Sequence, residues 1–455
     1  MLTVIDPTTG QLVREVEAAD AQQAQSAIAR AHDAYDGWRR RSFDERAEVL
    51  RGVAAAMRED RERLAMLMTE EMGKPITEAR GEVDKAAWCA DHYADHAEAY
   101  LATETFDSDA THSYVQYLPL GVVLGILPWN APFWLAFRFL APTLMAGNTC
   151  LMKHDSHVPA CAEAIAAVFE QVAGPDLVIN LPLRSPDVEP VIRDERVKAV
   201  SLTGSDRAGS AVASQAGSEI KPVVLELGGS DPAIVLADAD LEAAADMITT
   251  MRMINAGQSC IAAKRIIVED AVHDRFVDML TERMSAFTLG DPREESTQLG
   301  PIAREDLRDE LHSQVQRSVE AGATCVLGGE IPEGAGYFYP PTVLTGVTSD
   351  MAASCEETFG PVAGVLRVAD ADEALRVAND SPFGLGASVF TERARGEAMA
   401  AEIVSGQVAV NGIVKSDPRL PSGGVKRSGI GRELGPHGIQ EFVNAQQIWV
   451  GPKQD

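Results

Sequence analysis

The chain has 455 residues, of which 45% are hydrophobic, and its formal net charge is −28 at pH 7. This length permits large buried cores and predicts two or three structural units. The negative charge argues against nucleic acid and anionic membrane surfaces as partners, because both require a basic protein face. The six cysteines include no CxxC pair, a pattern typical of reduced cytosolic thiols rather than of a disulfide framework.

The apolar stretches indicate neither a secretory signal nor a membrane span. Residues 1–6 lack a basic region and a long apolar run, both of which a signal peptide needs. The most apolar stretch, 118–140, is interrupted by three prolines, Asn130 and Arg138, whereas a membrane helix needs roughly 20 uninterrupted apolar residues. We therefore expect a cytoplasmic protein.

Helices are predicted for the first hundred residues, and strands alternate with helices after them. The helical spacing of Ala, Leu, Met and charged residues extends over 21–40, 43–71 and 76–100. Residues 113–117 alternate like an exposed strand. The buried segments that follow are strands at 121–127, 149–152, 178–181 and 197–202, with a helix at 160–172. This is the rhythm of a doubly wound parallel sheet.

A second alternating pattern begins near residue 233. Its strands are expected at 233–236, 265–268 and near 324–327, and its helices at 241–254 and 272–287. We therefore predict an α/β fold whose main domain boundary lies just after Gly229.

Two motifs carry a pair of reactive side chains. Cys260 ends the glycine-bearing stretch Asn255-Ala256-Gly257-Gln258-Ser259-Cys260, and Glu226 lies at the end of the strand-like run that precedes Gly228-Gly229. A lone cysteine is usually a small buried hydrophobe. A thiol paired with a carboxylate instead fits covalent oxidation of an aldehyde, which needs a soft nucleophile and then a base for water.

The chain resembles the aldehyde dehydrogenase superfamily over nearly its whole length. Seven motifs occur in the order and spacing of that family: 5–10, 71–75, 127–130, 202–205, the Glu226 and Cys260 motifs taken together, 356–361 and 423–429. Within the superfamily, Met152-Lys153-His154 and the stretch 260–265 look most like the short succinate-semialdehyde dehydrogenase group.

The resemblance implies three structural parts. They are a Rossmann-like dinucleotide-binding domain (1–101 and 121–229), an α/β catalytic domain (230–440) and a small β oligomerisation arm (102–120 and 441–455). The alternating hairpin in the arm suits an edge that pairs with another subunit. A homodimer or a homotetramer is expected.

The resemblance also implies catalytic roles. Cys260 is the expected nucleophile, and the Asn130 side chain with the Cys260 N–H is expected to hold the oxyanion. Glu226 is the expected general base, and family members that transfer the acyl group to coenzyme A typically lack it, so a free acid is the expected product. Glu433 matches a glutamate thought to relay protons. Its usual lysine partner falls at Phe139, so an ordinary salt bridge for Glu433 stays open.

A dinucleotide site is expected where Gly204 and Ser205 open a helix, because helix N–H groups suit a pyrophosphate. The GxGxxG fingerprint is absent. The cofactor-binding residues that the resemblance implies are Trp129, Lys153, Ser156, Gly204, Ser205, Glu357 and Phe359. Many NAD-using relatives have glutamate where this chain has Ser156. The serine removes a charge that repels a 2′-phosphate and favours NADP, although the neighbouring Asp155 leaves NAD open.

The substrate prediction rests on Arg138, which matches an arginine that binds the distal carboxylate in succinate-semialdehyde dehydrogenases. Further pocket candidates are Phe133, Trp134, Phe137, Ile254 and Ser259. Succinate semialdehyde or a similar small semialdehyde is the best candidate. The alternative substrates are apolar or aromatic aldehydes. The alternative to an enzyme is a catalytically silent binding or structural subunit. Arg138 could instead serve as a structural ion-pair residue.

No metal is expected. His92 and His96 have the i, i+4 spacing of helical metal ligands, but no third ligand accompanies them. They are interpreted as part of a solvated helix face.

Overall fold

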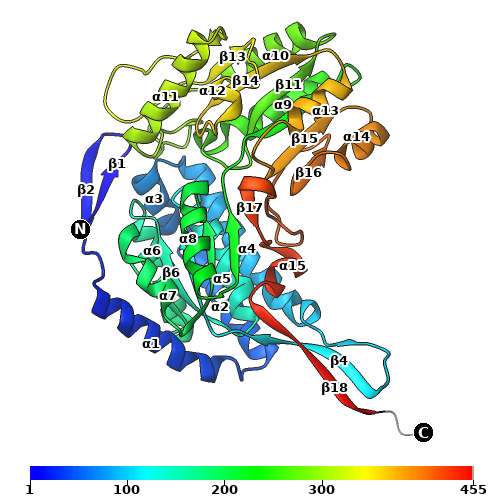
Figure 1. Cartoon of the computed structure of the whole chain (residues 1–455). Helices are drawn as coiled ribbons and strands as arrows, with labels where there is room; N and C mark the ends of the chain where they lie inside the picture. Colours follow the sequence, from blue (N-terminus) through cyan, green and yellow to red (C-terminus); the bar gives the residue numbers. More distant parts are fainter. Residues whose placement is uncertain (453–455) are drawn as a thin grey trace.

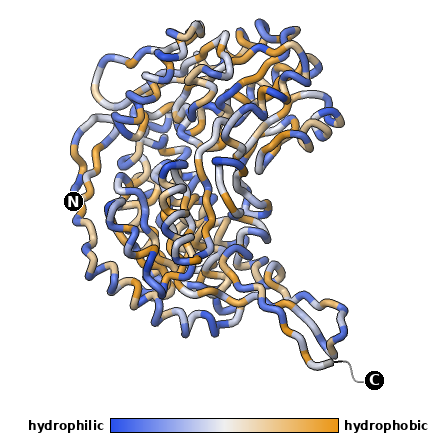
Figure 2. The backbone as a smooth tube through the Cα atoms, in the orientation of Figure 1, coloured by the Kyte–Doolittle hydropathy of each residue, from blue (hydrophilic) through white to orange (hydrophobic). Residues whose placement is uncertain are grey.

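The computed structural model describes residues 1–452. It has two lobes, each built around a mostly parallel sheet, and an arm that projects from the lower lobe (Figure 1). Hydrophobic stretches lie mainly in the interior of the lobes (Figure 2). No helix within residues 1–452 is long and apolar enough to cross a membrane. The predicted α/β class is confirmed.

The lower lobe contains a six-stranded sheet in the order β17-β9-β8-β5-β6-β7. All neighbouring pairs are parallel except β17 with β9. The strands are β5 (Val122–Leu127), β6 (Thr149–His154), β7 (Val178–Asn180), β8 (Val197–Thr203), β9 (Val223–Glu226) and β17 (Gly429–Ile430). The hairpin β1 (Leu2–Asp6) and β2 (Gln11–Val16) lies apart from this sheet.

The helices of the lower lobe begin with two capping boxes. Asp20 with Gln23 caps α1, and Ser42 with Glu45 caps α2. The helical stretch predicted over 43–71 is divided at Asp60, whose backbone leaves the helical region. The helices are α1 (Ala21–Trp38), α2 (Phe43–Glu59), α3 (Arg61–Met72), α4 (Ile76–Tyr100), α5 (Pro132–Met145), α6 (Pro159–Ala173), α7 (Glu189–Arg193), α8 (Asp206–Ser218) and α15 (Gly435–Gln440).

The upper lobe contains a seven-stranded sheet in the order β12-β13-β14-β11-β10-β15-β16. Only β12 with β13 is antiparallel. The strands are β10 (Asp231–Val235), β11 (Ala263–Glu269), β12 (Thr324–Leu327), β13 (Thr342–Thr345), β14 (Val362–Val368), β15 (Gly386–Phe390) and β16 (Gln407–Val410). The helices are α9 (Leu241–Met253), α10 (His273–Ser285), α11 (Glu305–Glu320), α12 (Ala352–Cys355), α13 (Ala371–Asn379) and α14 (Arg393–Ala400).

The chain changes lobes twice. It passes from the first sheet to the second between β9 and β10, next to the boundary predicted at Gly229. It returns at β17, which pairs with β9, and α15 then packs against α4 and α5. The stretch 429–440 was predicted to belong to the second domain, and its strand and helix lie on the first lobe instead. Residues this far apart in sequence pair because β9 offers an open edge.

The arm is a three-stranded antiparallel sheet in the order β18-β4-β3. Its strands are β3 (Glu104–Thr105), β4 (Ala110–Pro119) and β18 (Val443–Pro452), within the ranges predicted for it. Residues 453–455 of that prediction lie outside the described residues.

Glu71 joins α3 to α6 inside the lower lobe. Its buried carboxylate accepts hydrogen bonds from the N–H groups of Ala160 and Cys161 at 2.9 and 3.0 Å, in the first turn of α6. These donors have no partner within their own helix. Burial raises the pKa of Glu71.

We predict that Glu71→Ala destabilises the fold by about 1–3 kcal/mol, because two buried N–H groups lose their acceptor. The measurement is urea unfolding followed by circular dichroism. Glu70→Ala is the matched control, since its ion pair with Arg14, at 3.9 Å, is partly exposed, and the expected cost is within about 0.5 kcal/mol. Equal stability of the two variants would contradict the capping role.

Candidate active site

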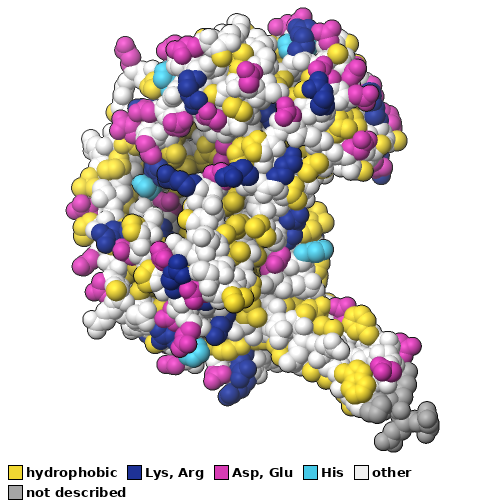
Figure 3. Space-filling view, viewed as in Figure 1, with side chains coloured by type: hydrophobic (Ala, Val, Ile, Leu, Met, Phe, Trp, Pro, Cys, Tyr) yellow, Lys and Arg dark blue, Asp and Glu magenta, His cyan; other side chains and the backbone are white. Residues whose placement is uncertain are grey.

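A cavity of about 360 Å³ lies where α4 and α5 of the lower lobe meet the start of the upper lobe. Figure 3 shows charged side chains of both signs interspersed over the two lobes, with a deep indentation between the upper lobe and the arm. The residues lining the cavity include Lys74, Glu78, Glu82, Lys85, Asn130, Trp134, Arg138, Met251, Ile254, Ser259, Cys260, Lys415 and Ser416. The predicted nucleophile, oxyanion donor and substrate arginine therefore share one cavity.

The turn before Cys260 has an unusual backbone. Asn255, Ala256 and Gly257 adopt φ values of 56°, 53° and 74°, directly after α9 ends. Left-handed conformations in two consecutive non-glycine residues are strained. The fully buried Arg252 donates to the Gly257 carbonyl at 2.6 Å, and a Cβ on Gly257 would lie 2.3 Å from the Gly360 carbonyl oxygen. Close packing thus holds the turn in one conformation.

Cys260 lines the cavity and is partly exposed. Burial raises its pKa to about 12, and the positive charges of Lys264 and Arg138 only partly oppose this effect. The Lys264 ammonium donates to the Cys260 carbonyl at 2.6 Å and to the Ser259 carbonyl at 3.0 Å. Arg265 instead donates to three backbone carbonyls elsewhere in the upper lobe. Of these two basic residues, Lys264 is the one that interacts with the Cys260 segment.

Asn130 lies beside the same turn, at the end of β5. Its side-chain nitrogen donates to the Gln258 carbonyl at 3.1 Å. The backbone carbonyl oxygen of Asn130 accepts hydrogen bonds from the Lys74 ammonium at 3.0 Å and from the Asn255 side chain at 2.9 Å. These bonds tie Asn130 to the segment that carries Cys260, as an oxyanion donor requires.

Arg138 lies between the two candidate acid–base residues. Its Nη2 is 2.9 Å from Glu226 Oε2, and its Nε is 2.7 Å from Glu433 Oε2. All three side chains are almost fully buried. Burial raises the pKa of Glu433 to about 7, and the nearby Glu226 charge acts in the same direction while Arg138 opposes it. Glu433 therefore forms a salt bridge, which was the alternative to a proton relay. Its partner is Arg138, because the position of the family's usual lysine is occupied by Phe139.

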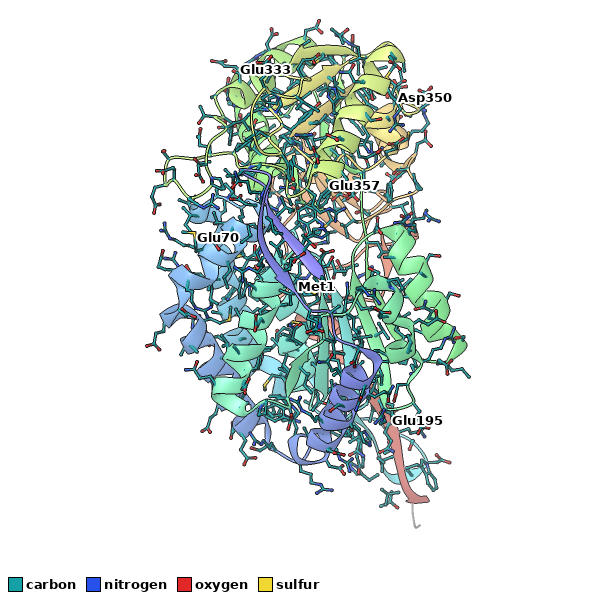
Figure 4. All side chains as sticks on the ribbon, turned by 90° about the vertical axis from the view of Figure 1, so that its left-hand side faces the viewer. Met1, Glu70, Glu195, Glu333, Asp350 and Glu357 are labelled. Carbon is teal, nitrogen blue, oxygen red and sulfur yellow. The ribbon has the colours of Figure 1, made fainter. Side chains whose placement is uncertain are left out.

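Three of the predicted cofactor-binding residues, Trp129, Glu357 and Phe359, lie near the junction of the lobes. Glu357 accepts from the Gly229 N–H at 2.9 Å and pairs with Lys264 at 3.2 Å; Figure 4 labels it between the lobes. The rings of Trp129 and Phe359 meet edge to face with centroids 5.7 Å apart. A side chain at Gly228 would overlap the Glu357 carboxylate. The close approach of the Glu357 side chain to the backbone therefore explains why position 228 is a glycine.

The predicted cofactor-binding residues Lys153, Gly204 and Ser205 lie at or directly after the carboxyl ends of β6 and β8. Ser205 is the N-cap of α8, whose N-terminus is therefore aimed at this edge of the sheet. The Lys153 ammonium forms no hydrogen bond or ion pair with any residue in 1–452, although the side chain is buried and its pKa is lowered by that burial. A buried, unpaired ammonium beside a helix N-terminus fits an anionic cofactor.

Three sequence predictions require correction. Phe133 and Phe137 do not line the cavity: both are fully buried in the lower core, where Phe137 stacks on Phe169. His92 is not on a solvated face: it is buried, with Nε2 3.1 Å from the Tyr100 hydroxyl. The sequence did not indicate this packing, because His92 is a polar residue four positions before the exposed His96. No group of three His, Cys, Asp or Glu side chains within residues 1–452 could hold a metal ion.

Three residues of α4 that were not predicted as site residues also line the cavity. Glu78, Glu82 and Lys85 recur at the spacing of one helix face, a signal that was available. Glu82 pairs with Lys74 and accepts from the N–H groups of Phe133 and Trp134. Burial raises the pKa of Glu78 to about 7.

The fold and the cavity define an enzyme of the dinucleotide-dependent class, and comparison with known proteins gives its family. The model of the aldehyde dehydrogenase family matches residues 1–448. The chain therefore belongs to the aldehyde dehydrogenase family, and it is an NAD(P)-dependent oxidoreductase.

The relatives and neighbours cover the whole chain. Succinate-semialdehyde dehydrogenase [NADP(+)] 1 of Mycobacterium ulcerans is 47% identical over 99% of this chain and 100% of its own length. Succinate semialdehyde dehydrogenase [NAD(P)+] Sad of Escherichia coli is 45% identical over 98% of this chain and 97% of its own length. The crystal structure of succinic semialdehyde dehydrogenase from Streptococcus pyogenes with NADP+ superimposes with a TM-score of 0.97, 37% identity and full coverage of both chains.

We predict that Arg138→Met lowers kcat for the uncharged aldehyde butanal by at least about tenfold, because removing one partner of a buried ion-pair cluster leaves uncompensated carboxylates. Steady-state kinetics with butanal measure this effect. If butanal turnover stayed at the wild-type level and only semialdehyde turnover fell, the main role of Arg138 would be substrate binding.

Proposed function

We propose that this enzyme oxidises succinate semialdehyde, or a similar small semialdehyde, to the dicarboxylate with NADP. The observation that carries the substrate class is the cavity itself, which combines Cys260 with the cationic side chains of Arg138, Lys85 and Lys415. Positive charge beside an otherwise largely apolar wall favours an aldehyde that carries a carboxylate. The full-length relatives named for succinate semialdehyde support the same substrate.

The proposed chemistry uses Cys260 and Asn130, which line the cavity, and Glu226, which is bound to the cavity residue Arg138. Once ionised, the Cys260 sulfur attacks the aldehyde carbon, and the resulting oxyanion is held by the Asn130 side chain and the Cys260 N–H. When bound, the nicotinamide supplies the oxidation by accepting a hydride from that carbon. Glu226 then accepts a proton from water as the water oxygen attacks the thioester carbon, the carbon–sulfur bond breaks and the acid leaves.

The cofactor preference is proposed from the turn at the end of β6. Asp155, which could repel a 2′-phosphate, accepts hydrogen bonds from the N–H and Nδ1 of His157 at 2.9 and 2.6 Å. Interaction with His157 lowers the pKa of Asp155 to about 2 despite its burial. The Asp155 carboxylate is therefore hydrogen-bonded to His157. Ser156 brings no charge, and the Lys153 ammonium is unpaired. These features favour NADP over NAD.

We further propose that the arm assembles subunits into a homo-oligomer. β18 is an edge strand of ten residues, and Trp449 and Val450 on it are 46% and 47% exposed. A long edge strand with exposed apolar side chains favours pairing with another chain. A cytoplasmic location remains a prediction.

The proposed function is tested by measuring the appearance of reduced cofactor with succinate semialdehyde and NADP. We predict that Cys260→Ala abolishes turnover but keeps NADP affinity, because the thiol forms the covalent bond and does not hold the cofactor. Binding of NADP by calorimetry is the control for folding. Residual turnover within about tenfold of wild type would contradict the role of Cys260.

We predict that Ser156→Glu shifts the preference from NADP toward NAD by about 5- to 150-fold, the equivalent of about 1–3 kcal/mol from a carboxylate facing the 2′-phosphate. The measurement is the ratio of kcat/KM for the two cofactors. Ser156→Ala is the control, because it removes the hydroxyl without adding charge. A wild-type enzyme that already preferred NAD by about tenfold would refute this interpretation of Ser156.

A further inference from the structure

Lys264, the second residue of β11, interrupts the regular pairing of this strand. Asp231 of β10 pairs with Ala263, but the residue after Asp231 pairs with Arg265. Lys264 is therefore an extra residue in β11, and irregularities of this kind often re-aim a side chain next to an active site. The Lys264 side chain is fully buried, and a buried ammonium is costly unless protein groups bind it.

The three N–H donors of this ammonium have three acceptors. The carbonyl oxygens of Ser259 and Cys260 lie 3.0 and 2.6 Å from the Lys264 Nζ, and the Glu357 Oε1 lies 3.2 Å from it. Glu357 is itself held by the Gly229 N–H at 2.9 Å. Because each donor has a fixed protein acceptor, the ammonium is held in one position beside the Cys260 backbone.

The two carbonyls belong to the peptide units on either side of the Cys260 Cα. The Ser259 carbonyl shares its peptide unit with the Cys260 N–H. This peptide is trans, so its carbonyl and its N–H point in opposite directions. The Ser259 carbonyl also accepts a hydrogen bond from the Ala262 N–H at 3.2 Å. By fixing the carbonyl on one side, Lys264 therefore fixes the direction of the Cys260 N–H on the other.

The Cys260 N–H is a donor without an acceptor in the protein. It forms no hydrogen bond with any residue in 1–452, and Cys260 lines the cavity together with Asn130. A hydrogen bond to the carbonyl of a peptide strengthens the N–H donor of the same peptide, and the positive charge of Lys264 acts in the same direction. An unused N–H that is polarised in this way suits a developing oxyanion.

We propose that Lys264 is a positioning residue for the oxyanion donor: by binding the Ser259 and Cys260 carbonyls, it directs and polarises the Cys260 N–H. This assignment rests on the proposed function, in which the Cys260 sulfur forms a bond to the aldehyde carbon and the carbonyl electron pair moves onto oxygen. Lys264 acts on that oxygen only through the backbone. Its contact with Glu357 gives an alternative, a role in cofactor binding, and the experiment separates the two.

The test compares two reactions of Cys260 in the full-length enzyme without cofactor. Thiolate attack on 4-nitrophenyl acetate creates an oxyanion before 4-nitrophenolate leaves, and release of the nitrophenolate gives its rate. Alkylation of Cys260 by iodoacetamide, followed by mass spectrometry, needs the same thiolate but forms no oxyanion. Lys264→Met removes the donors at similar volume, so it should lower the ester rate by at least about tenfold more than the alkylation rate.

Two further variants at this position complete the test. Lys264→Arg retains the charge and several N–H donors and should restore most of the ester rate. Lys264→Gln repeats the comparison if the methionine variant does not fold.

Lys221→Met is the matched control. Lys221 also donates to two backbone carbonyls, those of Ile192 and Asp194 at 2.5 and 2.6 Å, but it lies outside the cavity. Its replacement should change the ratio of the two rates by less than about twofold.

Calorimetry gives the NADP affinity of each variant. If Lys264→Met weakened NADP binding but kept the ester rate, Lys264 would act through Glu357 and the assignment would be overturned. Equal falls in the ester and alkylation rates would also overturn it, because Lys264 would then only stabilise the thiolate. A wild type that hydrolysed the ester but did not oxidise succinate semialdehyde would overturn the proposed substrate and leave the role of Lys264 in place.

Discussion

The buried ion-pair cluster of Arg138, Glu226 and Glu433 is the constraint on which the active site depends. It joins α5, the end of β9 and the segment after β17, three parts of the chain that are remote in sequence. Each charge would be costly to bury alone, so none of the three side chains can leave without exposing the others to a large desolvation penalty. The cluster therefore fixes the position of Glu226 relative to the cavity and returns the C-terminal segment to the first lobe.

The turn that carries Cys260, the proposed nucleophile, is held by close packing and by hydrogen bonds. Arg252 and the close approach of Gly360 hold the left-handed turn at 255–257, and Lys264 binds the carbonyls that flank Cys260. The side chain is thus aimed without a paired base at rest, which agrees with its raised pKa. Strain of this kind persists only where the surrounding packing over-determines it.

Unpaired cations lie on both sides of this centre. Lys153 is buried at the carboxyl end of β6, on the side of the helix N-terminus of α8, and Lys85 lines the substrate cavity. Neither ammonium forms a hydrogen bond or an ion pair with a residue in 1–452, although the Lys85 ammonium lies 4.1 Å from the centre of the Trp134 ring. Since a buried charge without a partner is costly, each is more favourably accommodated when an anion is bound.

The sequence by itself determined the α/β class, the alternation of strands and helices and the change of sheet near Gly229, and it pointed to Cys260, Asn130 and Glu226 as candidate catalytic residues. These features depend on local periodicity and on motifs whose residues are close together in the chain. It did not determine the return of β17 to the first sheet, the burial of His92 and Phe137, or the partner of Glu433. Those were decided by tertiary structure, because they depend on contacts between remote segments, as when Arg138 on α5 pairs with both Glu226 and Glu433.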